Sequence, residues 1–111
     1  MIAQVDRLRS MGVRVAMLSD QTNWLEEIDR TTSLFRHFDR VFNSFRTHKS
    51  KREPSVFGDV CGQLGAERGK VLFVDDNVDH TLRAQSQGLR TIRFVTTGDF
   101  KKQLKRYFPQ L

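Results

Sequence analysis

Lys70-Val71-Leu72-Phe73-Val74-Asp75-Asp76-Asn77 is an apolar run that ends in two adjacent carboxylates. Apolar residues on both faces are typical of a strand buried in a parallel sheet. In open α/β sheets, ligands bind in the crevice at the carboxyl ends of the strands. Carboxylates that face such a crevice need a cation or several hydrogen bonds to offset their desolvation. The segment therefore predicts a strand of an α/β sheet that ends in a site for a hard cation.

Helical and strand patterns alternate along the rest of the chain. The spacing of Ile2, Val5, Leu8 and Met11 predicts a first helix, which Gly12 ends. We expect helices over residues 2–11, 23–28, 31–38, 54–64, 78–87 and 99–108, and strands over residues 13–18, 41–45, 71–75 and 89–95. Strands that alternate with helices imply a parallel sheet with right-handed crossovers. Residues 71–75 suit a central strand and residues 89–95 an edge strand.

The composition fits one soluble domain of 111 residues. No apolar run reaches the roughly 18 residues needed to span a bilayer, and the N-terminus has no signal-peptide pattern. A lone Cys61 excludes an internal disulfide and fits a reducing compartment. On a predicted helix among apolar neighbours, we expect this thiol to be buried. The sequence therefore predicts a cytoplasmic protein with no membrane partner.

The net charge of +6 admits either a nucleic-acid binder or a protein with anionic substrates. The basic residues fall in two clusters, over residues 46–52 and 101–106. The second cluster fits a solvated helix face. No zinc-ligand spacing, aromatic-studded strand or glycine-rich loop accompanies the charge, so we expect no nucleic-acid partner. A nucleic-acid-binding domain remains the alternative, and it would bind with a strong dependence on salt.

Three polar segments follow predicted strands and should meet at one edge of a parallel sheet. They are Ser19-Asp20, Lys51 and Asp75-Asp76. A hydroxyl and an ammonium can bind a phosphate group, and carboxylates provide the oxygen ligands that Mg²⁺ requires. The sequence therefore predicts a site for a phosphorylated small molecule and a divalent ion.

In this order and spacing the segments resemble the motifs of the haloacid dehalogenase-like hydrolase superfamily. Residues 13–19 resemble the family's second motif, a strand ending in Ser or Thr. Residues 51–57, which begin Lys-Arg-Glu-Pro, resemble the third motif, a Lys ahead of a helix. Residues 71–76 resemble the fourth, a strand ending in paired acids. The resemblance covers the whole chain and implies a Rossmann-like α/β fold.

The resemblance also implies a role for each candidate residue. Ser19, with Asp20 beside it, would bind the transferring phosphoryl group, and Lys51 would be the catalytic cation that stabilises an aspartyl intermediate. Asp75 and Asp76 would hold Mg²⁺, weakly. Metal-free dehalogenases of the superfamily carry Ser and Asn at these two positions, so the acids point to the phosphatase branch and a small phosphomonoester substrate.

Two positions depart from the family pattern. Asp20 stands where Asn is usual and adds a negative charge close to the expected anion. His80 stands where an Asn often follows the acid pair by four residues. Because His37, His48 and His80 show no metal-ligand spacing, we interpret all three as surface residues.

The family's first motif, D-x-D-x-T at the end of the first strand, has no counterpart in residues 1–18. Its first Asp is the nucleophile, and covalent phosphoryl transfer does not proceed without one. We therefore expect residues 1–111 to be the C-terminal part of the family's core domain, an incomplete three-layer parallel sheet that lacks its first strand and cap. The chain alone would then be inactive. The alternative is a truncated, non-catalytic binding or assembly module.

The absent strand would lie between residues 13–18 and residues 71–75. Exposed strand edges recruit other strands. The two strands could pair directly, a second copy could dock as a homo-oligomer, or a separate segment could fill the gap. We expect association, either with a second copy or with a complementing segment.

Overall fold

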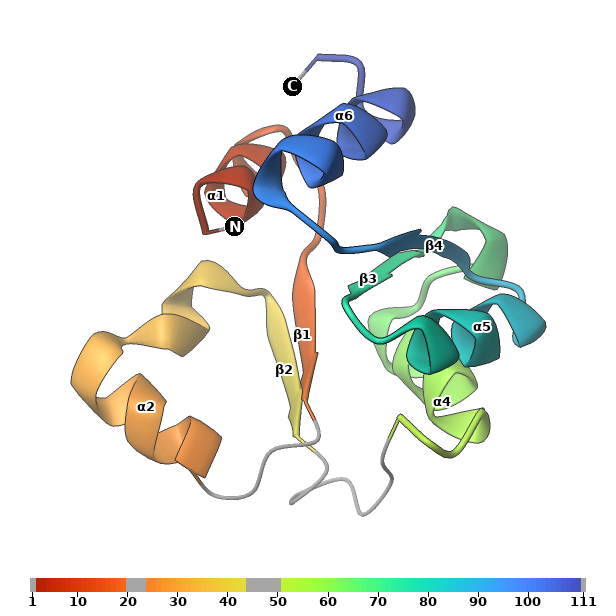
Figure 1. Cartoon of the computed structure of the whole chain (residues 1–111). Coiled ribbons are helices and arrows are strands. Elements are labelled where there is room, and N and C mark those ends of the chain that lie inside the picture. The colour runs from red at the N-terminus through yellow and green to blue at the C-terminus, as the bar shows by residue number, and fades with distance from the viewer. Residues whose placement is uncertain (1, 20–23, 44–50, 111) are drawn as a thin grey trace. The chain divides into compact units, whose positions relative to one another are not determined.

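A computed structural model describes residues 2–19, 24–43 and 51–110. The chain forms two compact units, Met1–Ser50 and Lys51–Leu111 (Figure 1). Both units combine helices with short parallel strands, so the predicted α/β class is confirmed.

The first unit contains one two-stranded parallel sheet. Its elements are α1 (Ile2–Ser10), β1 (Ala16–Ser19), α2 (Trp24–Thr32), the 3₁₀ helix η1 (Leu34–His37) and β2 (Arg40–Asn43). The strands β1 and β2 pair in register from Ala16 opposite Arg40 to Ser19 opposite Asn43. Val5 and Leu8 of α1 and Phe42 of β2 are buried.

Strand β1 begins three residues later than predicted. The Val13 amide donates to the carbonyl of Leu8, which closes the end of α1. The Val15 amide donates to Asp39 Oδ2 over 2.7 Å. The amides of Val13 and Val15 are therefore bound by the end of α1 and by a side chain, and not by a neighbouring strand.

The helix predicted over residues 31–38 is interrupted. Helix α2 runs to Thr32, and Ser33 then adopts a left-handed conformation with φ of 53°. The chain resumes as η1, whose Phe35 amide donates to Asp29 Oδ1 over 2.7 Å. Apolar spacing was a correct sign of helical structure here, but a left-handed residue cannot continue an α-helix.

Polar side chains tie α1 to η1 and to the start of β2. His37 Nδ1 lies 2.8 Å from Asp6 Oδ1. The guanidinium of Arg9 donates to the carbonyl of Arg36 and pairs with Asp39 at 3.1 Å. His37, interpreted from the sequence as a surface residue, is therefore a half-buried link within the first unit.

The second unit contains the other parallel sheet. Its elements are α4 (Ser55–Leu64), the 3₁₀ helix η2 (Arg68–Lys70), β3 (Leu72–Asp75), α5 (Val78–Ser86), β4 (Arg90–Arg93) and α6 (Thr97–Tyr107). The strands β3 and β4 pair in register from Leu72 opposite Arg90 to Asp75 opposite Arg93.

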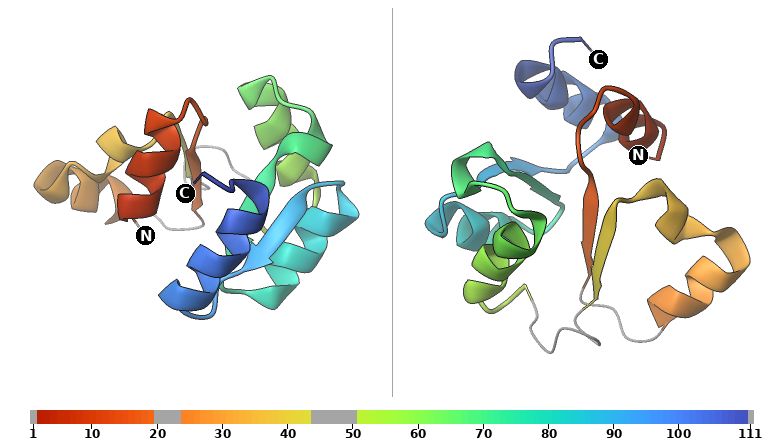
Figure 2. Two further views of the ribbon diagram at one scale, coloured as in Figure 1. Left: turned by 90° about the horizontal axis from the view of Figure 1, so that it is seen from above. Right: turned by 180° about the vertical axis from the view of Figure 1, so that it is seen from behind.

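Helices cover both faces of the β3–β4 sheet (Figures 1 and 2). Helix α4 packs on one face through Phe57, whose ring lies 5.0 Å from the ring of Phe73. Helix α5 reaches the same face, where Gln85 bonds to Thr91. Helix α6 packs on the other face, with Phe100 against Phe94. This three-layer arrangement encloses the buried residues Val56, Phe57, Cys61, Ala84, Leu89, Ile92, Phe100 and Leu104.

Residues 71–75 were predicted as a strand suited to a central position, and the strand β3 forms over Leu72–Asp75. All four of its residues are half-buried. Among the residues that the structure describes, β3 pairs with β4 alone. An apolar strand with one paired edge retains accessible surface even when helices cover both of its faces.

Arg68 connects three segments of the second unit. Helix α4 ends at Leu64, and Gly65 follows as a left-handed C-cap with φ of 63°. Beyond that cap, Arg68 Nη1 donates to the carbonyl and the side-chain oxygen of Gln87, each over 3.2 Å. The guanidinium also occupies the space beside Gly58, where a Cβ would lie 2.5 Å from Nη2. The turn after α5 is thereby linked to α4.

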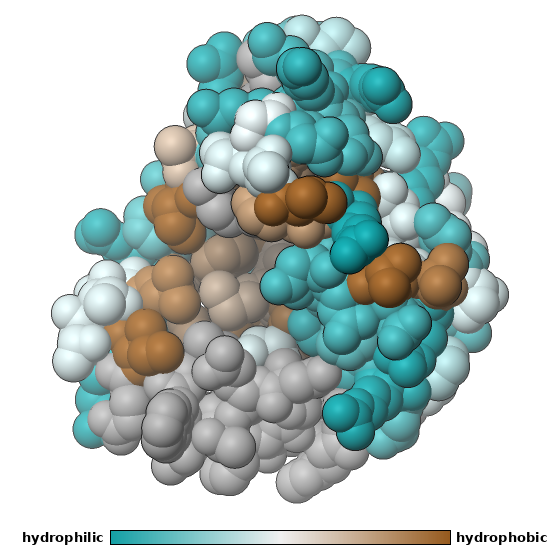
Figure 3. Space-filling model, in the orientation of Figure 1, coloured by the Kyte–Doolittle hydropathy of each residue, from teal (hydrophilic) through white to brown (hydrophobic). Residues whose placement is uncertain are grey.

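Figure 3 shows hydrophilic side chains over much of one face, with separate hydrophobic groups among them. The large apolar side chains with the greatest exposure in the described residues are Met11, Ile28, Val78, Leu82, Val95 and Tyr107. None of the helices in residues 2–19, 24–43 and 51–110 has the length and apolar character to cross a membrane.

Candidate functional site

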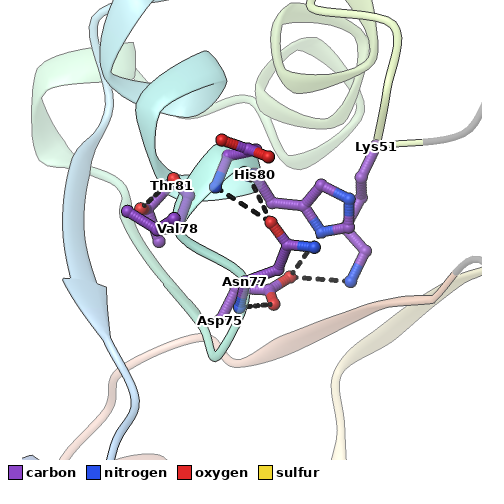
Figure 4. A network of polar contacts seen from close by, with 7 residues as sticks. Lys51, Asp75, Asn77, Val78, His80 and Thr81 are labelled. Carbon is purple, nitrogen blue, oxygen red and sulfur yellow. Dashed lines mark hydrogen bonds and ion pairs between the residues drawn. The ribbon is translucent and has the colours of Figure 1, made fainter.

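The carboxylate of Asp75, at the end of β3, is the centre of a polar network in the second unit (Figure 4). Lys51 Nζ donates to its Oδ2 over 2.7 Å, and the backbone amide of Asn77 donates to its Oδ1 over 2.9 Å. His80 Nδ1 lies 3.3 Å from the same Oδ2. The carboxylate is only 7% exposed, and the Lys51 side chain is 15% exposed.

Two opposing effects set the pKa of Asp75. Burial of the carboxyl raises the pKa because it disfavours the charged form. The hydrogen bond and the charge of Lys51, together with the hydrogen bond from Asn77, stabilise the anion and prevail, so the pKa falls from 3.8 to about 2. Asp75 is therefore ionised at neutral pH and is held by protein donors on both oxygens.

Asn77 holds the start of α5 beside this network. Its Oδ1 accepts from the backbone amides of Asp79 and His80, over 2.9 and 3.2 Å. This N-cap fixes the first turn of α5, which carries His80. The interpretation of His80 as a surface residue is wrong, because its side chain is 14% exposed and faces Asp75. The sequence cue for this position was its spacing from the acid pair.

Asp76 follows Asp75 at the end of β3 and is exposed. Mg²⁺ in proteins commonly takes one or two carboxylates and completes its octahedron with water. One exposed and one held carboxylate fit that minimal donor set. No group of three or more His, Cys, Asp or Glu residues among residues 2–19, 24–43 and 51–110 forms a fuller metal cage. The donor set therefore fits a weakly bound Mg²⁺ with mostly water ligands.

The remaining predicted site residues lie in the first unit. Ser19 is the last residue of β1 and is half-buried. Asp20 lies outside the described residues. The meeting of Ser19 with Lys51 and the acid pair would span the two units, so it stays a prediction, as does the catalytic role of Lys51.

A comparison of the sequence with models of protein families identifies the family of this chain. Residues 2–88 match the family model of the haloacid dehalogenase-like hydrolases. The chain belongs to this hydrolase family. The resemblance of its motifs to those of haloacid dehalogenase-like hydrolases is thereby confirmed.

Two curated relatives have different names. The chain is 28% identical over 108 residues to "Enolase-phosphatase E1" of Sorangium cellulosum, with 91% of this chain and 44% of that protein covered. It is 31% identical over 71 residues to "Drimenol cyclase drtB" of Aspergillus calidoustus, with 64% of this chain and 13% of that protein covered. The chain thus spans less than half the length of both relatives.

Solved structures of haloacid dehalogenase-like proteins share the fold. A predicted hydrolase of this kind from Porphyromonas gingivalis superposes with a TM-score of 0.83 and 21% identity, covering 96% of this chain and 55% of that one. A family enzyme from Bacteroides thetaiotaomicron, in complex with magnesium and inorganic phosphate, superposes with a TM-score of 0.78 and 19% identity. That match covers 86% of this chain and 52% of the other.

The Asn77 cap yields a first prediction. Asn77→Ala removes the acceptor for two amides at the start of α5, so we expect the unfolding free energy to fall by about 1 kcal/mol. Thr96→Ala is the matched control, because Thr96 caps α6 through Asp99 and lies outside the Asp75 network. Urea unfolding of both variants should give losses of similar size. Only Asn77→Ala should also shift the carboxyl ¹³C resonance of Asp75, and an unchanged resonance would contradict the link between cap and network.

Proposed function

We propose that this chain supplies the phosphate-handling and magnesium-handling part of a haloacid dehalogenase-like phosphatase. The observation that carries the proposal is the 2.7 Å contact between Lys51 Nζ and the buried Asp75 carboxylate, with the exposed Asp76 next to it. A cation fixed beside an acid pair at the end of a parallel strand is suited to charge development on a phosphoryl group.

The two acids would have different tasks. Asp75 is engaged by Lys51 and Asn77, so its main task would be to hold the ammonium in place. Asp76 is exposed, so it would provide the direct contact to Mg²⁺. Bound Mg²⁺ would neutralise phosphate charge. Lys51 would add a second positive charge at the same edge, and Ser19 would donate its hydroxyl to a phosphate oxygen.

The proposed substrate is a small phosphomonoester. Acids at positions 75 and 76 support it, since the metal-free dehalogenase pattern has neither. The name of the Sorangium relative, an enolase-phosphatase, points to the same substrate class. The cap that would shape a substrate pocket has no counterpart in these 111 residues, so the class is proposed without a specific compound.

As a chain of 111 residues the protein should not turn over substrate, because its sequence holds no D-x-D-x-T nucleophile motif. The second candidate function is a non-catalytic binding or assembly module. The two candidates differ in one respect. The catalytic part should gain activity when a segment with the nucleophile is supplied, and the assembly module should not.

The test of the chain alone is hydrolysis of an aryl phosphate in the presence of Mg²⁺. We expect no turnover above the background rate, and the same result for Asp76→Ala. Turnover by the wild-type chain that disappears in Asp76→Ala would contradict the prediction and would reveal a nucleophile outside the family motif. Mg²⁺ binding, followed by NMR, should be weak and should perturb resonances of Asp75 and Asp76.

A further inference from the structure

One edge of β4 is open among the residues that the structure describes. The amides of Arg90 and Phe94 donate to carbonyls on the β3 side, over 3.0 and 2.8 Å. In a parallel ladder, alternate residues of a strand direct their amides and carbonyls to the same neighbour. Arg90, Ile92 and Phe94 therefore face β3, whereas Thr91 and Arg93 direct their backbone groups to the opposite, outer edge. Within the described part of the chain no backbone hydrogen bond reaches that outer edge.

Two arginines flank the outer edge, one on each face of the sheet. Arg90 lies on the α6 face, where its guanidinium carbon is 6.0 Å from the centre of the Tyr107 ring. Arg93 shares the other face with Thr91, whose hydroxyl bonds to Gln85 of α5. Both arginines are exposed, and neither has an ion-pair partner among the described residues. The outer edge is therefore cationic on both faces of the sheet.

The charge argues against a second copy of the chain as the occupant of this edge. Antiparallel pairing of β4 with itself can be centred on Thr91, Ile92 or Arg93. In these three registers two copies of Arg90 lie diagonally across the ladder, two copies of Arg93 lie diagonally, and two copies of Arg93 lie directly opposite. Like charges directly opposite each other are destabilising, and long side chains also reach diagonal neighbours. The arginines thus oppose self-association, as charges on edge strands commonly do.

An acidic strand from another protein would meet no such repulsion. Backbone hydrogen bonds of an added strand supply affinity, and cross-strand pairs of opposite charge supply selectivity. Val95 follows β4 and is 65% exposed, so it offers an apolar contact just beyond the arginines. We propose that the outer edge of β4 binds an extended, acidic segment of a partner protein by strand addition. This inference concerns the edge of β4 that faces away from β3, and it does not rest on the proposed function.

The test uses two capped hexapeptides, Val-Glu-Val-Thr-Glu-Val and the same peptide with Lys in place of both Glu. The two acids stand three positions apart, as Arg90 and Arg93 do. The Glu peptide should slow hydrogen exchange at the amides of Thr91 and Arg93, followed by NMR, and leave exchange at Arg90 and Phe94 unchanged. The Lys peptide should bind at least about tenfold more weakly. Added salt should weaken binding of the Glu peptide.

Charge reversal tests the role of the arginines directly. Arg93→Glu should lower the affinity for the Glu peptide by about fivefold or more and raise the affinity for the Lys peptide by a similar factor. Lys102→Glu is the matched control, because it makes the same reversal at an exposed lysine of α6 and should change each affinity by less than about twofold. Arg90→Glu is the second variant for the case in which circular dichroism shows that Arg93→Glu does not fold.

Three results would overturn the inference. Equal affinity for the two peptides would mean that the arginines select no partner. Unchanged exchange at Thr91 and Arg93 with both peptides would mean that the edge accepts no strand. Slowed exchange at these two amides that increases with protein concentration in the absence of peptide, together with a dimer in analytical ultracentrifugation, would assign the edge to a second copy of the chain.

Discussion

Lys51→Met should reduce the unfolding free energy of the chain by about 2 kcal/mol at neutral pH. The substitution keeps most of the aliphatic length of the side chain and removes the ammonium that lies 2.7 Å from Asp75. The Asp75 carboxylate is 7% exposed, so water cannot replace the lost donor fully. Urea unfolding at pH 7, followed by far-UV circular dichroism, measures this loss of unfolding free energy.

The pH dependence of that loss has a defined sign. The pKa of Asp75 is lowered from 3.8 to about 2, since the donors of Lys51 and Asn77 outweigh the opposing effect of burial. A lowered pKa contributes stability that is fully present above the unfolded value and is lost as the pH falls toward the folded value. The gap between wild type and Lys51→Met should therefore be fully present at neutral pH and should close as the pH falls toward about 2.

Lys70→Met is the matched control for this prediction. Lys70 Nζ lies 3.8 Å from Glu67, and both side chains are more than three-quarters exposed. Exposed pairs of this kind contribute less than about 1 kcal/mol. If Lys51→Met and Lys70→Met have equal effects, or if the Lys51 effect persists at pH 2, the ion pair with Asp75 does not stabilise the unit as described.

Supplying the absent nucleophile should have the largest effect on activity. A segment with an apolar strand that ends in D-x-D-x-T, added in trans or fused ahead of residue 1, should raise aryl phosphate hydrolysis from background by at least about 10³-fold. The physical reason is that the segment would bring a carboxylate nucleophile to Lys51 and the acid pair. Hydrolysis measured with saturating Mg²⁺ gives the readout.

Two controls separate catalysis from simple association. The same segment with Asn in place of its first Asp should bind but give no turnover. Asp76→Ala in the chain should also abolish turnover while the segment still binds, which size-exclusion chromatography can follow. If the segment binds and neither version is active, the assembly-module alternative is favoured. If it does not bind at all, the expectation of a complementing segment is wrong.

Much of the fold could be predicted because local signals agreed with the long-range packing. The apolar run before Asp75 predicted a strand over residues 71–75 and the pattern of residues 54–64 predicted a helix, and the structure has β3 over Leu72–Asp75 and α4 over Ser55–Leu64. The strand at residues 13–18 was misplaced because Asp39, far along the chain, bonds to the Val15 amide. A pattern confined to neighbouring residues holds no information on such a partner.

The candidate site was likewise predicted in part, and the part that depends on distant contacts was missed. Motif order singled out Lys51 and the acid pair, and the structure places Lys51 against Asp75. The part played by His80 was missed, since a histidine without ligand spacing gives no periodic signal. Its position depends on where α5 begins, and that start is fixed by the side chain of Asn77. Contacts that rely on a helix cap become visible only when the helix is placed in three dimensions.

The position of the Arg68 guanidinium beside Gly58 limits how much stability a substitution at Gly58 can add. Exchanging a helical glycine for alanine normally adds about 1 kcal/mol of stability. Here the new methyl group would meet Arg68 Nη2 at 2.5 Å, so the guanidinium would have to swing away from the oxygens of Gln87. The guanidinium is the end of a flexible side chain and can shift at low cost, but weakening these hydrogen bonds, worth about 0.5–1.5 kcal/mol each, would offset part of the gain. A substitution to alanine within α4 is therefore better placed at Gly62, where the new methyl group would meet no atom within 4 Å.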